Sequence, residues 1–159
     1  MLNFFKKKEN KIILYKPVPG KVIDITEAPD EVFSQKYLGD GVAVIPEGNV
    51  IAAPCDGTIL HIANSLHAVA VGTEEGLEVL IHIGLDTVLL KGKGFTSFVK
   101  NGDTVKKGDK LVSFDRSYIE VQGKSLVTPV VITNMSEKVK GITKHKESST
   151  EVLMEVQLK

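Results

Sequence analysis

Two histidines, His67 and His82, have the residue type and the spacing that chemistry requires. The short polar stretch Thr73–Gly76 separates the β-type runs that carry them, and it is typical of a hairpin turn. A hairpin centred on the Glu74–Glu75 bond would pair the two histidines directly, with Cβ atoms roughly 4.5–5.5 Å apart. An imidazole nitrogen can accept a transferred group reversibly, and two imidazoles with a carboxylate can bind zinc.

This register makes specific predictions about both faces of the hairpin. On the histidine face the predicted partners are Val69 with Leu80 and Val71 with Glu78, and on the other face Ala68 with Ile81 and Ala70 with Val79. The second face pairs small with large side chains, which packs well. A register shifted by one residue would turn the two histidines to opposite faces.

The elements that must position the histidines are short strands. The β-type segments after Ile12 are 21–25, 42–45, 50–52, 58–63, 67–72, 77–84, 110–114, 129–133 and 151–158. Turn residues separate them at intervals typical of an all-β sandwich or barrel. Residues 27–38 and 118–123 each favour about one turn of helix. Gly-Asp turns in 101–111 are similar to those of biotinyl and lipoyl carrier domains and indicate a compact barrel-sandwich hybrid.

Composition points to one globular domain without a strongly charged partner surface. The 159 residues are 42% hydrophobic, and 20 basic residues balance 20 acidic ones, which does not favour a nucleic-acid partner. Cys55 is the single cysteine, so neither an internal disulfide nor a cysteine-based zinc cluster can form.

The beginning of the chain is predicted to be a flexible tail over residues 1–10, followed by a single domain over 11–159. The tail has its apolar residues before its charges, which is the wrong order for a secretory signal. No apolar run is long enough to cross a membrane. We therefore expect a cytoplasmic protein with no integral membrane segment.

A longer stretch around His82 resembles a known family. Residues 76–88 (GLEVLIHIGLDTV) are similar to the histidine motif of the glucose-type enzyme IIA component of the bacterial phosphoenolpyruvate-dependent sugar phosphotransferase system. Further matching segments occur in the family's order at 38–44, 53–57, 67–68, 91–95 and 128–134. The resemblance extends over residues 11–159.

The resemblance implies a fold, an activity and partners. The implied fold is an antiparallel β-sandwich with little helix. The implied activity is that of a phosphotransferase component, which accepts a phosphoryl group from the histidine-containing carrier protein HPr and donates it to a cysteine on the IIB domain of a sugar permease. No cofactor is required, the chain is expected to be a monomer, and proteins of this family also act as phosphorylation-dependent regulators.

The resemblance also implies roles for individual residues. His82 matches the phosphorylated histidine, whose acceptor atom is Nε2, and a backbone carbonyl near Gly84 could hold the proton on Nδ1. His67 matches the second histidine, which stabilises the phosphoryl group. Ser65 stands where the family more often has threonine, and its hydroxyl is expected to orient an imidazole.

Two further sets of residues are expected around the histidines. Asp40 and Asp86 match carboxylates that flank the family's site, although both also occur in ordinary turn sequences. Partner proteins must approach His82 closely, so a shallow apolar rim is expected for docking. The candidates for this rim are Val42, Val69, Leu80 and Val88.

A zinc-dependent hydrolase of barrel-sandwich fold is the alternative function. His82 and Asp86 have a His-x-x-x-Asp spacing, and with His67 they could bind zinc and leave one position open. The sequence lacks a His-x-His pair and an obvious general base, so phosphotransfer is favoured. The two histidines could still bind zinc adventitiously, or in a site that a partner protein completes.

Overall fold

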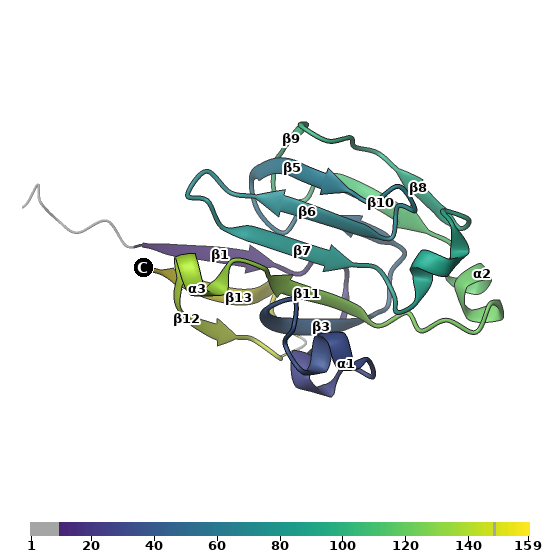
Figure 1. Ribbon diagram of the computed structural model, residues 1–159, viewed down its shortest axis with the longest axis horizontal. Helices are drawn as coiled ribbons and strands as arrows, with labels where there is room; N and C mark the ends of the chain where they lie inside the picture. Colours follow the sequence, from purple (N-terminus) through teal and green to yellow (C-terminus); the bar gives the residue numbers. More distant parts are fainter. Residues whose placement is uncertain (1–9, 148) are drawn as a thin grey trace, which may run out of the picture.

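Strands dominate the structure, a computed structural model that describes residues 10–147 and 149–159 (Figure 1). The strands are β1 (Lys11–Tyr15), β2 (Gly20–Asp24), β3 (Asp40–Pro46), β4 (Val50–Ala52), β5 (Gly57–Ile62), β6 (Ala68–Gly72), β7 (Glu78–His82), β8 (Phe95–Ser97), β9 (Thr104–Val105), β10 (Lys110–Phe114), β11 (Thr128–Ile132), β12 (Val139–Lys144) and β13 (Val152–Leu158).

The helical segments are all short. They are η2 (Ile25–Glu27), α1 (Glu31–Ser34), η3 (Thr87–Leu90), α2 (Arg116–Val121) and α3 (Met135–Lys138). The first helical turn predicted from the sequence corresponds to α1 and the second to α2. The segments η3 and α3 were not predicted, because each is too short to show a helical period.

The strands form three antiparallel sheets. A seven-stranded sheet has the order β2-β3-β11-β7-β6-β5-β9, and two three-stranded sheets have the orders β1-β13-β12 and β4-β10-β8. In Figure 1, β5, β6 and β7 run side by side, β8 and β10 lie behind them, and the C-terminus lies beside the beginning of β1. The predicted all-β, antiparallel fold is confirmed.

Strand β11 is buried on both faces, because a helical segment covers the outer face of the sheet. All five of its residues are buried. Val130 faces the main core between the sheets, whereas Val131 faces a second cluster that contains Ile25 and Phe33. Apolar side chains from the segment between β2 and β3 therefore hold α1 against the outer face of β3, β11 and β7.

The observed register of the β6–β7 hairpin differs from the predicted one. Ala68, not His67, is the partner of His82, and Val69 is the partner of Ile81. The turn is centred on Glu75, since the N–H of Thr73 donates to the carbonyl of Leu77 at 2.9 Å. The predicted register is wrong by one residue because the loop holds an odd number of residues.

The one-residue change of register exchanges the two faces of β6. Val69 and Val71 point into the main core with Val79 and Ile81, although they were predicted to share the histidine face. On β7, Leu80 and Glu78 keep the face of His82, where they lie opposite Ala70 and Gly72.

The predicted tail begins outside the described residues. Residues 1–9 are not described, but Asn10, which was assigned to the tail, is tied to the last strand. Its carbonyl accepts a hydrogen bond from the N–H of Leu158 at 2.7 Å, and its amide donates to the carbonyl of Lys159 at 3.2 Å. Within the described part of the chain, no helix is both long and apolar enough to cross a membrane.

Candidate active site

The two histidine rings meet even though their residues are not direct strand partners. The ring centroids of His67 and His82 are 4.9 Å apart, and the ring planes are inclined by 77°. Strand β6 begins only at Ala68, and Leu66 has a left-handed backbone with φ of 61°. The chain turns just before His67, so this side chain does not follow the alternation of the strand and its ring reaches His82.

The orientation of His82 is set by its own chain two residues further on. Its Nδ1 lies 2.7 Å from the carbonyl oxygen of Gly84. A carbonyl oxygen only accepts hydrogen bonds, so Nδ1 carries the proton and donates it. Nε2 of the neutral ring is then unprotonated and has a free lone pair. The carbonyl expected near Gly84 from the sequence is present, and it leaves Nε2 as the nucleophilic atom.

Position 84 requires glycine for two reasons, its backbone conformation and the close approach of neighbouring atoms. Its φ is +74°, and a Cβ atom added there would lie 2.6 Å from Cγ2 of Thr87 and 2.7 Å from the carbonyl oxygen of Ser125. Thr87 is fully buried and its hydroxyl donates to the carbonyl of Ile83. Neither neighbour can move without breaking a buried contact.

Replacing Gly84 with alanine is therefore expected to lower the free energy of unfolding by about 2–4 kcal/mol, from backbone strain and overpacking together. Chemical denaturation measures the change, and the Nδ1 proton of His82 in an NMR spectrum reports the hydrogen bond. Gly123→Ala is the matched control, because its φ is +76° and nothing lies within 4 Å of an added Cβ. Equal losses in the two variants would show that the close contacts at Gly84 are unimportant.

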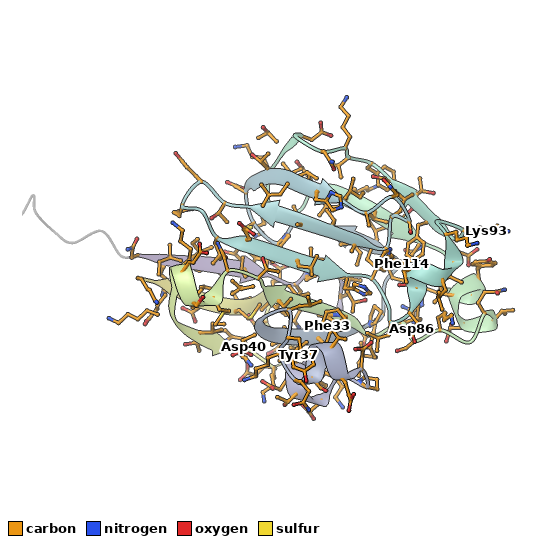
Figure 2. The ribbon with its side chains drawn as sticks, in the orientation of Figure 1. Phe33, Tyr37, Asp40, Asp86, Lys93 and Phe114 are labelled. Carbon is orange, nitrogen blue, oxygen red and sulfur yellow. The ribbon has the colours of Figure 1, made fainter. Side chains whose placement is uncertain are left out.

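Helix α1 supplies two groups beside His82. The ring of Phe33 lies 5.0 Å from the imidazole, inclined by 60°. Asp30 is the N-cap of α1, where its carboxylate accepts a hydrogen bond from the N–H of Val32 at 2.9 Å. Figure 2 shows Phe33 at α1 and Asp86 in the segment that follows β7, so the two approach the site from different elements.

Burial and charge act in opposite directions on His82. Burial lowers the pKa of His82 below its ordinary value of 6.5, while the Gly84 hydrogen bond and the charges of Asp30 and Asp86 act to raise it. Burial has the largest effect, so the imidazole is neutral at pH 7. Asp30 and Asp86 thus lie near the imidazole of His82, but their charges do not raise its pKa enough for it to take up a proton at pH 7.

Asp30 takes the place that the sequence analysis assigned to Asp40. Asp40 on β3 pairs with Ile132 on β11, and Ile132 pairs with Val79 on β7. Asp40 therefore lies level with Val79, three residues before His82. Three residues along a strand span about 10 Å. Asp40 is therefore not a flanking carboxylate, whereas Asp86 is one. The helix-capping pattern at Asp30, directly before a helical turn, was the signal that could have identified this residue.

The expected contact of Ser65 is not formed. Nδ1 of His67 is buried and has no hydrogen-bond partner among the described residues, so the Ser65 hydroxyl does not donate to it there. Burial, with a smaller contribution from the nearby His82, lowers the pKa of His67 to about 4. His67 is consequently neutral at pH 7 and its ring has one N–H to donate.

The buried, neutral state of His67 predicts a dependence of stability on pH. The unfolded imidazole takes up a proton below its ordinary pKa of 6.5, whereas the folded one resists protonation until about pH 4. Stability is therefore complete above pH 6.5 and falls as the pH decreases to 4, by about 3 kcal/mol at 1.36 kcal/mol for each pKa unit. Urea denaturation at several pH values measures it. His67→Gln should show a shallower decline, and identical curves would contradict the assignment.

The predicted docking residues separate into two groups. Val42 and Val69 are fully buried in the main core, so they cannot form a surface rim, and this expectation is corrected. Leu80 is half-buried against the cluster under α1, and Val88 is 47% exposed in η3. Near α1 and η3, the sequence analysis missed the exposed apolar side chains of Val32, Tyr37, Leu38 and Leu89. They lie in or beside α1 and η3, which show no strand alternation.

Metal ligands are few at this site. Across the residues that the structure describes, no group of three or more His, Cys, Asp or Glu side chains is placed to hold a metal ion. His67 and His82 would supply two ligands, which is fewer than the three protein ligands of a typical catalytic zinc site. Cys55 is buried, and burial raises the pKa of its thiol to about 12.

Known proteins share both the sequence and the fold. A family model described as "phosphoenolpyruvate-dependent sugar phosphotransferase system, EIIA 1" matches residues 12–138. A glucose-specific EIIA component of this system from Haemophilus influenzae is 46% identical over 136 residues, which are 84% of this chain and 82% of that protein. A glucose-specific EIICBA component from Staphylococcus saprophyticus is 43% identical over 148 residues, which are 93% of this chain and 22% of that longer protein.

A solved structure agrees with the sequence comparisons. The glucose permease IIA from Mycoplasma capricolum superimposes with a TM-score of 0.83 and is 34% identical in sequence. The superposition covers 97% of this chain and 99% of that one. The similarity therefore extends through all three sheets and includes the β6–β7 hairpin beside the two histidines.

Proposed function

We propose that this chain, which belongs to the EIIA 1 family of the phosphoenolpyruvate-dependent sugar phosphotransferase system, is a phosphocarrier that accepts its phosphoryl group on Nε2 of His82. The observation that carries the proposal is the hydrogen bond from Nδ1 of His82 to the carbonyl of Gly84. It leaves Nε2 as the one ring nitrogen with a lone pair for attack on phosphorus.

The transfer divides into two steps of the same kind. In the first, Nε2 forms a bond to phosphorus while the bond from phosphorus to the donor breaks. In the second, a nucleophile of the acceptor attacks the same phosphorus, and the electron pair returns to Nε2. The carbonyl of Gly84 holds the ring in place through both steps, so no cofactor is needed to position or activate the nucleophile.

The groups around His82 have complementary roles in this proposal. His67 is neutral, and its N–H can donate to phosphoryl oxygens as negative charge develops on them. The carboxylates of Asp30 and Asp86 act electrostatically on His82, and their repulsion of the phosphoryl oxygens favours release of the phosphoryl group to the next protein. Ser65 has no role in this proposal, because Nδ1 of His67 has no hydrogen-bond partner among the residues that the structure describes.

The proposed donor is HPr and the proposed acceptor is a cysteine on the IIB domain of a sugar permease. The name of the Staphylococcus saprophyticus relative, an EIICBA component, supports the acceptor, because this chain corresponds to 22% of a protein with B and C parts as well. Because the proposed donor is HPr, the chain is proposed to act in the cytoplasm. Its phosphorylation state would also be available to regulatory target proteins.

Phosphorylation with purified components tests the proposal. The full chain is incubated with radiolabelled phosphoenolpyruvate, the first enzyme of the system and HPr. We expect one phosphoryl group for each chain, labile to acid and to hydroxylamine as a phosphohistidine is. Omission of HPr is the control and should leave the chain unlabelled. A chain that stays unlabelled with all components, or a label stable to acid, would refute the proposal.

Partner docking is expected to depend on exposed apolar residues near His82. Val88→Asp places a charge at a site that is 47% exposed in η3, six residues after His82. Desolvating that charge in an interface should slow transfer from HPr and to IIB by about tenfold or more, without unfolding the domain. Transfer rates and thermal denaturation measure both effects.

Leu60→Asp is the matched control for Val88→Asp. Leu60 is also 47% exposed, and its side chain lies beside Gly72, at the opposite end of the hairpin from His82. Its substitution should leave both transfer rates near those of the unmodified chain. If the two aspartate variants behave alike, Val88 is not part of the interface.

A further inference from the structure

One lysine connects two sheets close to the helical segment beside His82. Lys144 ends β12 in a three-stranded sheet, whereas Asp24 and Asp40 belong to the seven-stranded sheet. Its Nζ lies 2.7 Å from Oδ1 of Asp24 and 2.8 Å from Oδ1 of Asp40. The side chains of Lys144, Asp24 and Asp40 are only 17%, 23% and 25% exposed, so this ion pair is partly shielded from water.

The two carboxylates mark the two ends of one chain segment. Asp24 is the last residue of β2 and Asp40 is the first of β3, and the chain between them leaves the sheet to form η2 and α1. Asp24 is also the N-cap of η2 and accepts hydrogen bonds from Thr26. The ammonium group of Lys144 therefore binds the two residues that flank segment 25–39. We call these two flanking positions the base of the segment, and Lys144 closes the base by linking them.

Segment 25–39 carries the groups that surround His82. Phe33 contacts the imidazole ring, and Asp30 is one of the two carboxylates whose charge acts on it. The segment is held on the sheet by a small apolar cluster in which Ile25, Ala28 and Phe33 are buried. The two ends of the segment are fixed by the pairing of Asp24 with Val42 in the β2–β3 ladder and by Lys144, which binds Asp24 and Asp40.

Electrostatic interactions strongly favour the arrangement in which Lys144 binds both Asp24 and Asp40. Burial acts to raise the pKa of Asp24, but hydrogen bonds from Lys144 and Thr26 outweigh it and hold that pKa far below its ordinary value. Burial likewise acts to lower the pKa of Lys144, and the two carboxylates raise it instead. Without the Lys144 ammonium group, the carboxylates of Asp24 and Asp40 would repel each other, and the more exposed Lys36, 3.6 Å from Oδ2 of Asp40, would offset this only in part.

We propose that Lys144 is a positioning residue for the phosphoryl acceptor: by closing the base of segment 25–39, it holds Phe33 and Asp30 in place against His82. The proposal rests on the proposed function only for the statement that His82 is the acceptor. Its structural content, the coupling of Lys144 to the surroundings of His82, can be measured without any phosphoryl transfer.

The test compares three variants of the full chain with the unmodified protein. Lys144→Met removes the charge and keeps the length of the side chain, and Lys144→Arg keeps the charge. Lys140→Met is the matched control, because Lys140 is an exposed residue of the same strand. The measurements are amide hydrogen exchange of residues 25–39, the pKa of His82 by NMR titration, and the rate of labelling from HPr.

In Lys144→Met, exchange in residues 25–39 should increase about tenfold and labelling should slow about tenfold, since a small displacement at a reacting centre is costly. The pKa of His82 should rise toward 6.5, because burial has a larger effect on it than the charge of Asp30. Lys144→Arg and Lys140→Met should match the unmodified chain in exchange and in pKa.

Each outcome separates this proposal from the proposed function. Unchanged exchange and unchanged His82 pKa in Lys144→Met overturn the positioning role, whether or not the chain is labelled. Altered exchange and pKa in that variant, with no labelling of the unmodified chain, support the positioning role and refute the phosphocarrier. If Lys144→Met does not fold, Asp40→Asn replaces it, and faster exchange limited to the end of the segment near Asp40 supports the role, whereas unchanged exchange overturns it.

Discussion

Replacing His82 with alanine is expected to abolish phosphoryl uptake completely. The variant has no nitrogen in place of Nε2. His67 cannot substitute for it, because its Nδ1 is buried and has no hydrogen-bond partner among the described residues to fix the tautomer, as the Gly84 carbonyl does for His82. The loss should exceed a thousandfold, the scale seen when an essential nucleophile is removed. Labelling from phosphoenolpyruvate through HPr, followed by mass spectrometry of the intact chain, measures it.

The fold must survive for this result to be informative. His82 lies at the end of β7 and is only partly buried, so we expect a cost of about 1–2 kcal/mol from the lost contact with Phe33 and the lost hydrogen bond to Gly84. Circular dichroism and thermal denaturation check this. His61→Ala, at an exposed histidine of β5, is the matched control and should be labelled normally. Labelling of the His82→Ala chain at the normal rate would refute the assignment of the acceptor.

Replacing His67 with glutamine is expected to separate the two halves of the reaction. Nε2 of His82 is untouched, so the chain should still be labelled. Onward transfer to IIB should fall by about 10²–10³-fold, because the donor to the developing charge on the phosphoryl oxygens is lost or misplaced. A rapid-quench experiment with the isolated phosphorylated chain and a IIB domain measures the second step alone.

The double variant His67→Gln with His82→Ala is the control for this experiment. It should carry no label, which shows that the phosphoryl group in the single variant is on His82. A single variant that passes its phosphoryl group to IIB at the normal rate would remove His67 from the mechanism, even if His82 remains the acceptor. A variant that is not labelled at all would place His67 in the first step as well.

Local sequence signals were sufficient for the strands and for part of the site. Alternation of small and β-branched residues identified β6, a run rich in β-type residues identified β7, and glycine and aspartate marked the turns between short strands. The motif around His82 identified the family over the chain, and the family model confirms it. A backbone carbonyl near Gly84 was named as one that could bind Nδ1, and the structure places the Gly84 carbonyl there, only two residues after His82.

Local signals failed where a residue's environment depends on a distant segment. Asp40 was assigned to the site, yet Lys144, 104 residues later, binds its carboxylate at the base of the segment. Val42 was assigned to the surface, but β11 pairs with β3 and buries it. Asp30 was missed because its proximity to His82 depends on how the helix that it caps packs on the sheet.

By itself, the sequence determined the all-β class, which follows from side-chain period and turn residues, both local along the chain. The motif around His82 determined the family, and the resemblance to that family implied the antiparallel sandwich and pointed to the two histidines. Only the tertiary structure decided the register of the hairpin, the path by which His67 reaches His82, and the carboxylates that flank the acceptor. A one-residue change in a turn exchanges the faces of a strand, and contacts between sheets join residues that no local pattern connects.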